Sequence, residues 1–291
     1  MPTVNIKRPV TQEWLVDKTS TIYSLPLFYE RLNEIINHPR CSIDDIAKVI
    51  TEDQGLTARL LKLANSPMFG YFSKIDTISK AVTIIGTQQL RDLALAMSVI
   101  EIFTDIPEEL INMKSFWQHS IACGIIARAL AAYRRESNVE RFFAAGILHD
   151  VGQLVMCTAA PEIVRELLIA SRRDDSLFTE RELVDLGFNH ATVGGGLLDK
   201  WKIPASIAEP VSRHHTPAKA ERYPVGVAII HLADIICHAM EMGCSCERFV
   251  HPLDSTAWER LDIPASSLSR IVSHIEPQVE ETFAILGEVA Q

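Results

Sequence analysis

The stretch "RFFAAGILHDVGQLV", residues 141–155, places a His–Asp pair, His149 and Asp150, at the end of an apolar run. Gly152 follows two residues later. The apolar run has the composition of a buried helix, whereas imidazole and carboxylate groups bind transition metals or carry protons. Two interpretations are open. The pair is either the centre of a metal site or a polar stop at the end of a core helix.

Helical periodicity extends over most of the chain. Ser42 and Asp45 form a capping-box-like helix start, and Leu56, Leu60 and Leu63 recur at helical spacing. The period-two alternation of half-buried strands is nearly absent. These patterns predict an all-α protein.

Residues 79–103, "SKAVTIIGTQQLRDLALAMSVIEIF", predict one long amphipathic helix. Their apolar stripe contains Val82, Ile85, Leu93, Met97 and Ile100.

Charge and apolar content exclude several classes of protein. The 291 residues carry a formal net charge of −9, which argues against a nucleic-acid surface. The N-terminal stretch lacks an apolar core of signal-peptide length, and the longest apolar segments, such as residues 225–236, are shorter than a bilayer span. The six cysteines have no disulfide-framework spacing and are typical of reduced thiols. We expect a cytoplasmic protein that binds neither nucleic acid nor membrane.

Histidines are concentrated in the second half of the chain. Seven of the ten lie between residues 113 and 240, whereas residues 20–105 contain His38 alone, and the acidic, Pro-containing stretch 104–116 separates the two parts. Several helices together can direct such side chains at one point. The candidate ligands are His119, His149, Asp150, His190, His214, His215 and Asp234.

The number of these candidates bears on the number of ions. Five His and two Asp exceed what one ion binds while leaving a position open for water. If all seven bind, they imply two ions about 3.5–4 Å apart, bridged by a carboxylate such as Asp150. The mixed imidazole and carboxylate set suits Fe, Mn or Zn. A single His on a helix is more often a hydrogen-bonded group than a ligand, so spacing alone leaves the metal site open.

The glycine triplet at residues 194–196 allows two interpretations. Each Gly inside a helix costs about 0.8–1 kcal/mol relative to Ala, so the triplet indicates either close helix packing beside His190 or a helix that begins after Gly196. It lacks the Lys and Ser/Thr of a phosphate-binding loop.

A second set of residues, near position 240, also allows two interpretations. Cys237, Cys244 and Cys246 with His238 could hold zinc, but ordinary thiols fit the unpaired Cys-x-Cys spacing better. His231 shares a helix face with Asp234 and His238. It either supports the candidate ligands by hydrogen bonding or is a neighbour in the core.

Several separate segments resemble the HDOD domain, the HD-related output domain of bacterial signalling proteins. Residues 42–96 resemble its N-terminal half, and "FFAAGILHDVGQLV", "HATVGGGLLDKW", "RHHTP" and "HLADII" resemble its second half in the same order. The resemblance covers roughly residues 23–240. It implies an all-α fold with an N-terminal helical lobe at residues 21–110 packed on an HD-like lobe at residues 111–240. An N-terminal extension (1–20) and a helical C-terminal tail (241–291) flank the lobes.

The HD superfamily consists of metal-dependent phosphohydrolases, and the resemblance places its two-metal ligand set on the seven candidates above, with Asp150 also holding the reactive water. The chain departs at four places from the pattern of the cyclic-dinucleotide phosphodiesterases in this superfamily. Gln153 replaces a Lys, Ser115 replaces an acidic residue, and Thr216 with "RYP" at 222–224 replaces a Glu and a Gly-Tyr-Pro motif.

The resemblance with these departures implies a bacterial signal-transduction module that binds an unidentified signalling protein or a phosphate-containing small molecule. The alternative is an active metal-dependent phosphohydrolase, acting on phosphodiesters or nucleotides.

Overall fold

The structure, a computed structural model, describes residues 10–25, 27–71, 73–103, 106–273 and 275–286. No strand occurs among these residues, and every regular element is helical. The first helices are α1 (Gln12–Ile22), α2 (Leu27–Ile36), α3 (Ile43–Thr51), α4 (Gln54–Ala64), α5 (Ile78–Ile85) and α6 (Thr87–Ile102). The central helices are α7 (Met113–Tyr133), α8 (Glu140–Leu148), α9 (Val151–Ala159), α10 (Pro161–Asp174), α11 (Phe178–Leu186), α12 (His190–Lys200) and α13 (Ala205–Arg213). The 3-10 helix η1 (Pro217–Lys219), α14 (Pro224–Ala239), α15 (Ser255–Leu261), α16 (Ala265–Val272) and α17 (Glu276–Leu286) complete the chain.

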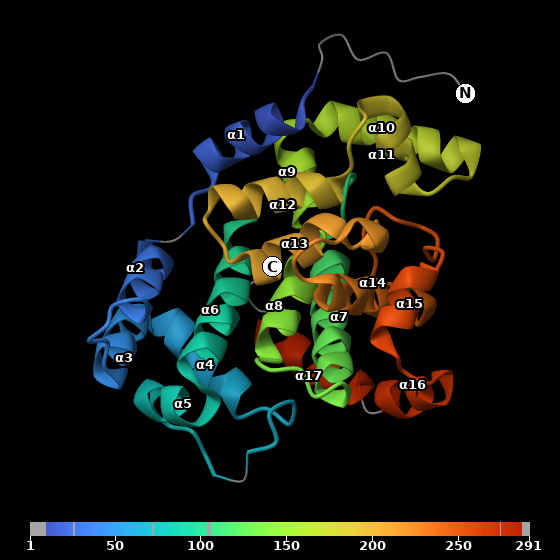
Figure 1. Cartoon of the computed structure of the whole chain (residues 1–291). Helices are drawn as coiled ribbons and strands as arrows, with labels where there is room; N and C mark the ends of the chain where they lie inside the picture. The colour runs from blue at the N-terminus through green and yellow to red at the C-terminus, as the bar shows by residue number, and fades with distance from the viewer. Residues whose placement is uncertain (1–9, 26, 72, 104–105, 274, 287–291) are drawn as a thin grey trace.

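Two helical lobes pack side by side. Helices α2–α6 lie together on one side of the molecule, and α7–α9 with α12–α14 form the other side (Figure 1). Helix α6 packs on α8 and joins the lobes. Helices α7 and α8 approach closely at two glycines, because a Cβ on Gly146 would lie 2.5 Å from the Cα of Gly124. The predicted all-α fold with two packed lobes is confirmed.

The single long helix predicted for residues 79–103 is wrong. The chain breaks at Gly86, whose φ of +105° is incompatible with a helix. Gly86 ends α5 by donating its N–H to the carbonyl of Val82, and its own carbonyl accepts the N–H of Leu90 in α6. A glycine in a periodic pattern is tolerated by a helix but also allows this turn, so the periodicity alone missed the break.

Other local predictions are confirmed. Ser42 and Asp45 form a full capping box on α3, and Leu56, Leu60 and Leu63 are the buried stripe of α4. The glycine triplet lies inside α12, which begins at His190, so a helix starting only after Gly196 is wrong. Close packing is the reason for the triplet, since a Cβ on Gly195 would lie 2.4 Å from the Cβ of Ser212.

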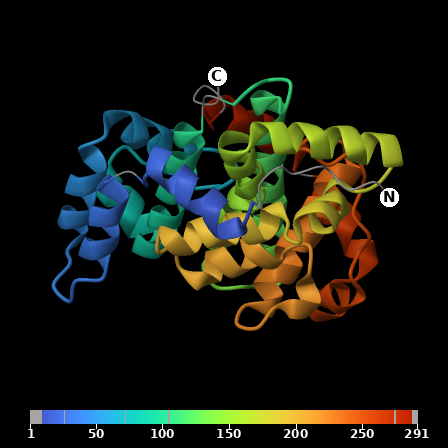
Figure 2. The ribbon, with the colours of Figure 1, turned by 90° about the horizontal axis from the view of Figure 1, so that it is seen from above.

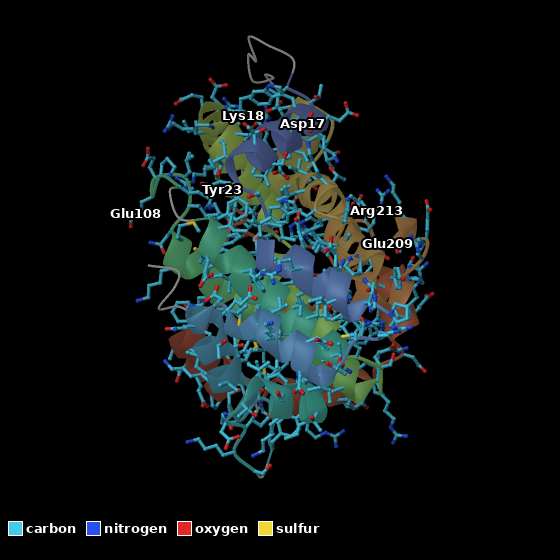
Figure 3. All side chains as sticks on the ribbon, turned by 90° about the vertical axis from the view of Figure 1, so that its left-hand side faces the viewer. Asp17, Lys18, Tyr23, Glu108, Glu209 and Arg213 are labelled. Carbon is cyan, nitrogen blue, oxygen red and sulfur yellow. The ribbon has the colours of Figure 1, made fainter. Side chains whose placement is uncertain are left out.

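Helix α1, in the predicted N-terminal extension, packs across the second lobe. It lies against α12 and α9, and the view from above shows it crossing them (Figure 2). Lys18 donates to the carbonyl of Ala159 at 2.5 Å, and Asp17 pairs with Lys200 on α12; Asp17 and Lys18 are labelled in Figure 3. Residues 1–9 of the extension lie outside the described residues, as do residues 104 and 105 at the predicted lobe boundary.

Between residues 255 and 286 the C-terminal tail forms α15, α16 and α17, whereas residues 241–254, predicted as part of a helical tail, contain no helix. Helix α15 packs on α14, and α16 packs on α7. Helix α17 contacts both α7 and α4, so it covers parts of both lobes. The tail's residues 274 and 287–291 lie outside the described residues.

The expectation that the longest apolar segments are shorter than a bilayer span is wrong for one segment. Residues 140–159, which include α8 and α9, are long and apolar enough to cross a membrane by length and composition. However, 94% of the most apolar window is buried inside the protein. That burial is typical of a core helix pair of a soluble protein rather than of a membrane span.

Candidate metal centre

All seven candidate residues converge on one point of the second lobe, where α7, α8, α12, α13 and α14 meet (Figure 1). They are His119 on α7, His149 and Asp150 between α8 and α9, His190 at the start of α12, His214 and His215 directly after α13, and Asp234 on α14. They fall into overlapping groups whose potential ligand atoms lie within 4.8 Å of one another. The proximity is established by the fold, whereas their role as ligands stays a prediction.

The His–Asp pair forms the junction between two helices. Helix α8 ends at Leu148 and α9 begins at Val151, so His149 and Asp150 make a two-residue turn inside a buried run. Gly152 then allows α9 to touch the start of α12, because a Cβ there would lie 1.9 Å from the carbonyl oxygen of His190. The pair thus lies at the end of core helix α8, where the turn and the glycine hold it, buried, against α12.

The carboxylate of Asp150 faces two sets of imidazoles. Its Oδ1 lies 3.1 Å from Nε2 of His190 and 3.8 Å from Nε2 of His214. Its Oδ2 lies 3.3 Å from Nε2 of His149. The Nε2 of His215 extends the first set, since it lies 3.0 Å from Nε2 of His190. One oxygen toward each set is the arrangement of a bridging carboxylate.

The carboxylate of Asp234 lies close to His119, the remaining candidate, and to His149. Its Oδ1 lies 3.2 Å from Nε2 of His119 and 3.6 Å from Nε2 of His149. A third imidazole reaches the same oxygen, because Nε2 of His238, one turn further along α14, lies 3.3 Å away. Asp234 and Asp150 are therefore the two anionic centres of the cluster, and His149 lies between them.

These distances fit atoms that share an ion. Ligands bonded at about 2.0–2.2 Å around one ion lie roughly 3.0–3.6 Å from each other. Nε2 of His214 is buried and has no hydrogen-bond partner, and Nε2 of His149 is buried between the carboxylates of Asp150 and Asp234, at 3.3 and 3.6 Å. The Nδ1 atoms of His149 and His214 each donate to a backbone carbonyl at 2.7 Å, of Gly146 and Val211 respectively. This leaves the Nε2 lone pairs pointing inward, as metal-binding histidines require, so the residues fit a metal.

Two further groups orient the candidate ligands. Glu182 on α11 binds His190 twice, through its Nδ1 at 2.7 Å and its backbone N–H at 3.1 Å. His231 donates from Nδ1 to the carbonyl of His214 at 2.8 Å and accepts the N–H of Asp254 at 3.0 Å. Since both nitrogens of His231 are used, it supports the backbone of His214 and is no ligand.

The cluster contains anionic carboxylates, cationic imidazoles and neutral imidazoles. Burial disfavours charge on Asp150 and Asp234, yet the surrounding imidazoles hold the pKa of both carboxyls well below their usual range. Burial also opposes the charge on His190, but Glu182 and Asp150 raise its pKa to about 10. For His214, burial and the repulsion of its neighbours lower the pKa to about 3. Without metal, this lobe therefore holds charged and neutral imidazoles side by side.

Metal affinity is expected to increase with pH. Although burial opposes their charge, acidic neighbours raise the pKa of His190 to about 10 and that of His149 well above its usual value, so at pH 7 both carry a proton that a metal ion must displace. Apparent affinity should therefore increase at least about tenfold per pH unit from pH 7 to 9. Competition with a fluorescent chelator at pH 7, 8 and 9 measures it, and an affinity that does not change with pH would contradict the assignment.

Three residues next to the seven candidates are not predicted by the sequence motifs: Glu182, His238 and His251. Glu182 lies on a separate helix with no motif around it. His251 lies in the segment after α14, where its ring centroid is 4.2 Å from that of His215. His238 shares a helix face with Asp234. The i, i+4 spacing of these two residues is the sequence signal that would place His238 in the cluster.

The alternative cysteine zinc site is not formed. All six cysteines are free, and among the described residues no potential metal group contains one. Cys237 is buried, whereas Cys244 is exposed beside Ser115. The interpretation as ordinary thiols agrees with this separation.

The departures at Gln153 and Ser115 have a structural role. Oε1 of Gln153 accepts the N–H of Cys246 at 3.0 Å. The carbonyl of Ser115 accepts the N–H of Cys244 at 3.3 Å, and its Oγ lies 3.1 Å from the sulfur of Cys244. Both positions therefore hold the segment after α14 against the second lobe.

The "RYP" residues belong to the loop before α14. The N–H groups of Arg222 and Tyr223 donate to the carboxylate of Glu209 on α13, labelled in Figure 3.

Sequence comparisons identify a family and one relative. A family model described as the HDOD domain matches residues 22–217. A protein of Treponema pallidum (strain Nichols), described only as uncharacterized, is 26% identical over 225 residues, which are 76% of this chain and 43% of that protein. The chain therefore spans less than half the length of that relative.

Solved structures share the architecture. A protein of Shewanella amazonensis SB2B described as a "Putative phosphohydrolase" matches with a TM-score of 0.75 and 23% identity, over 94% of this chain and 98% of that one. An HDOD domain protein of Geobacter sulfurreducens with unknown function matches with a TM-score of 0.71 and 24% identity, over 96% and 97%. At these identities the likeness establishes the fold alone.

Proposed function

The chain belongs to the HDOD domain family, and from that premise we propose that it is a regulatory module of bacterial signal transduction with a dinuclear HD-type metal centre. The observation that carries the proposal is the inward convergence of the buried imidazoles on Asp150 and Asp234. In particular, Nε2 of His214 is buried without a hydrogen-bond partner. A buried polar atom without a partner costs about 1–3 kcal/mol, and a bound ion removes that cost.

We assign the ligands to two positions that share Asp150. Its Oδ1, with His190, His214 and His215, forms one position, and its Oδ2, with His119, His149 and Asp234, forms the other. The imidazole-rich set suits Fe, Mn or Zn.

A regulatory role is favoured over catalysis by what surrounds the cluster. Six of the seven assigned ligands are buried and His215 alone is partly exposed, so in this conformation the cluster offers a substrate little direct access. Gln153 is neutral and already bonded to Cys246, so it offers no positive charge to a phosphate. We propose that the module acts in the cytoplasm by binding a signalling protein or a phosphate-containing small molecule.

The alternative is a metal-dependent phosphohydrolase, and the position of Asp150 supports it. Two divalent ions, when bound, polarise a phosphoryl oxygen and lower the pKa of a bridging water toward neutrality. Asp150 would orient that water from between the two positions, and Glu182 would hold His190 in place. The name of the Shewanella amazonensis protein is consistent with this alternative.

Metal content and turnover together test the proposal. The purified chain, reconstituted with Fe²⁺, Mn²⁺ or Zn²⁺ without oxygen, should retain at least two equivalents by elemental analysis. His149→Ala should lose at least one, because it removes an imidazole that faces both carboxylates. His38→Ala, an exposed histidine in the loop after α2, is the matched control and should change nothing.

The same samples are then assayed on model phosphodiesters, cyclic dinucleotides and nucleotides. A regulatory module should give no turnover above that of the free metal. Turnover that His149→Ala abolishes and His38→Ala retains would establish the phosphohydrolase instead. Folded protein that stays metal-free after reconstitution would overturn both functions.

A further inference from the structure

The segment that follows α14 lies across the candidate metal centre. Residues 241–254, here called the strap, connect α14 to α15 and contain no helix. The strap is tied to the second lobe by Cys246 N–H bonding to Gln153, Asp254 N–H bonding to His231, and Glu247 accepting the N–H of Phe178 at 2.8 Å. These contacts fix the strap's backbone beside the cluster.

The strap contributes an imidazole to the cluster. His251 is 8% exposed, and one of its ring nitrogens lies within 4.8 Å of ligand atoms of both His215 and Asp234. Its Nε2 lies 3.5 Å from Oε2 of Glu247 and 3.4 Å from Oγ1 of Thr179. A carboxylate beside an imidazole is the usual support for a metal-binding histidine.

A second, independent observation points to the same place. Nε2 of His215 faces Nε2 of His190, but Nδ1 of His215 is buried and has no hydrogen-bond partner. His238 lies alongside, with Nε2 at 3.3 Å from Oδ1 of Asp234 and its ring 6.5 Å from that of His251. More imidazoles therefore surround Asp234 than the two positions sharing Asp150 can use.

We propose that the chain binds a third divalent cation between Asp234, His215 and His251, with His238 as an adjacent donor; His215 would then bind through both ring nitrogens as an imidazolate, its remaining ring proton released to solvent. The inference rests on the proposed dinuclear centre and extends it. A mixed imidazole and carboxylate set favours Zn²⁺, Mn²⁺ or Fe²⁺ over Ca²⁺. The carboxylates of Asp234 and Glu247 offset the added positive charge. Asp234, His238 and His251 lie beyond the residues that the family model matches, which end at 217.

Metal stoichiometry tests the third position directly. The full chain, reconstituted with Zn²⁺ or Mn²⁺ and freed of loose metal, should contain three equivalents by elemental analysis. His251→Ala should contain two, since the positions that share Asp150 keep all their ligands. His38→Ala is again the control and should keep three. His251→Gln, which retains a polar side chain of similar reach, should also contain two and serves if His251→Ala does not fold.

Each remaining outcome overturns a different claim. Two equivalents in both the wild type and His251→Ala would exclude the third cation and leave the dinuclear centre standing. Loss of two or more equivalents in His251→Ala would show that the strap supports the shared centre rather than a separate position. Folded wild-type protein without metal would remove the proposed function and the third cation together. A Co²⁺-loaded sample adds a second measurement, because its visible absorption should decrease by about one site's contribution in His251→Ala.

Discussion

Replacing Asp150 with asparagine is expected to remove both metal positions at once. Asp150→Asn keeps the shape of the side chain but removes the negative charge that faces His149 on one side and His190 on the other. Loss of groups that only support a metal ligand already costs about 10–100-fold in affinity, so loss of the shared ligand should cost at least about a hundredfold. Elemental analysis should show about two equivalents fewer than in the wild type.

The control for this prediction is Asp175→Asn. Asp175 is exposed after α10 and adopts a left-handed conformation that asparagine also tolerates. It should keep the full metal content. Circular dichroism of both variants establishes that they are folded, and a folded Asp150→Asn that retains wild-type metal content would contradict a bridging role.

Local sequence patterns predicted helix starts and buried helix faces correctly where the pattern spans a single helical turn. The capping box at Ser42 and the leucine stripe of α4 depend on neighbours three or four residues away. At Gly86 the same reasoning failed, because the periodicity of the flanking residues continues through a backbone conformation that only glycine adopts easily.

The candidate site could be predicted only in part, for a different reason. Spacing alone allowed His149 and Asp150 to be either a metal site or a helix end. The concentration of histidines in the second half supplied the seven candidates, and the order of motifs shared with a family placed a two-metal ligand set on them. His251 and Glu182 follow no such order. They reach the cluster because the strap and α11 fold back onto it, and nothing local in the sequence determines that placement.

Replacing Gly152 with alanine is expected to have the largest effect on stability. The added Cβ would lie 1.9 Å from the carbonyl oxygen of His190 and 2.7 Å from the backbone nitrogen of Gly194. Both atoms belong to the backbone of α12, so no side chain can rotate away, and α9 must separate from α12. Overpacking of a core typically costs 1–3 kcal/mol, and we expect a loss of about 3 kcal/mol or more in the free energy of unfolding.

The separation should also affect metal binding, because Asp150 is on the α9 side of this contact and His190 is on the α12 side. Urea unfolding of metal-free and metal-loaded protein measures both effects. Gly55→Ala is the matched control, since a Cβ there in α4 would meet side-chain atoms alone, the end of Arg59 at 3.1 Å and Oδ1 of Asp53 at 3.4 Å. It should leave stability unchanged or increase it by about 0.4–1 kcal/mol. If Gly152→Ala unfolds at the same urea concentration as Gly55→Ala, the contact between α9 and α12 does not determine the geometry of the centre.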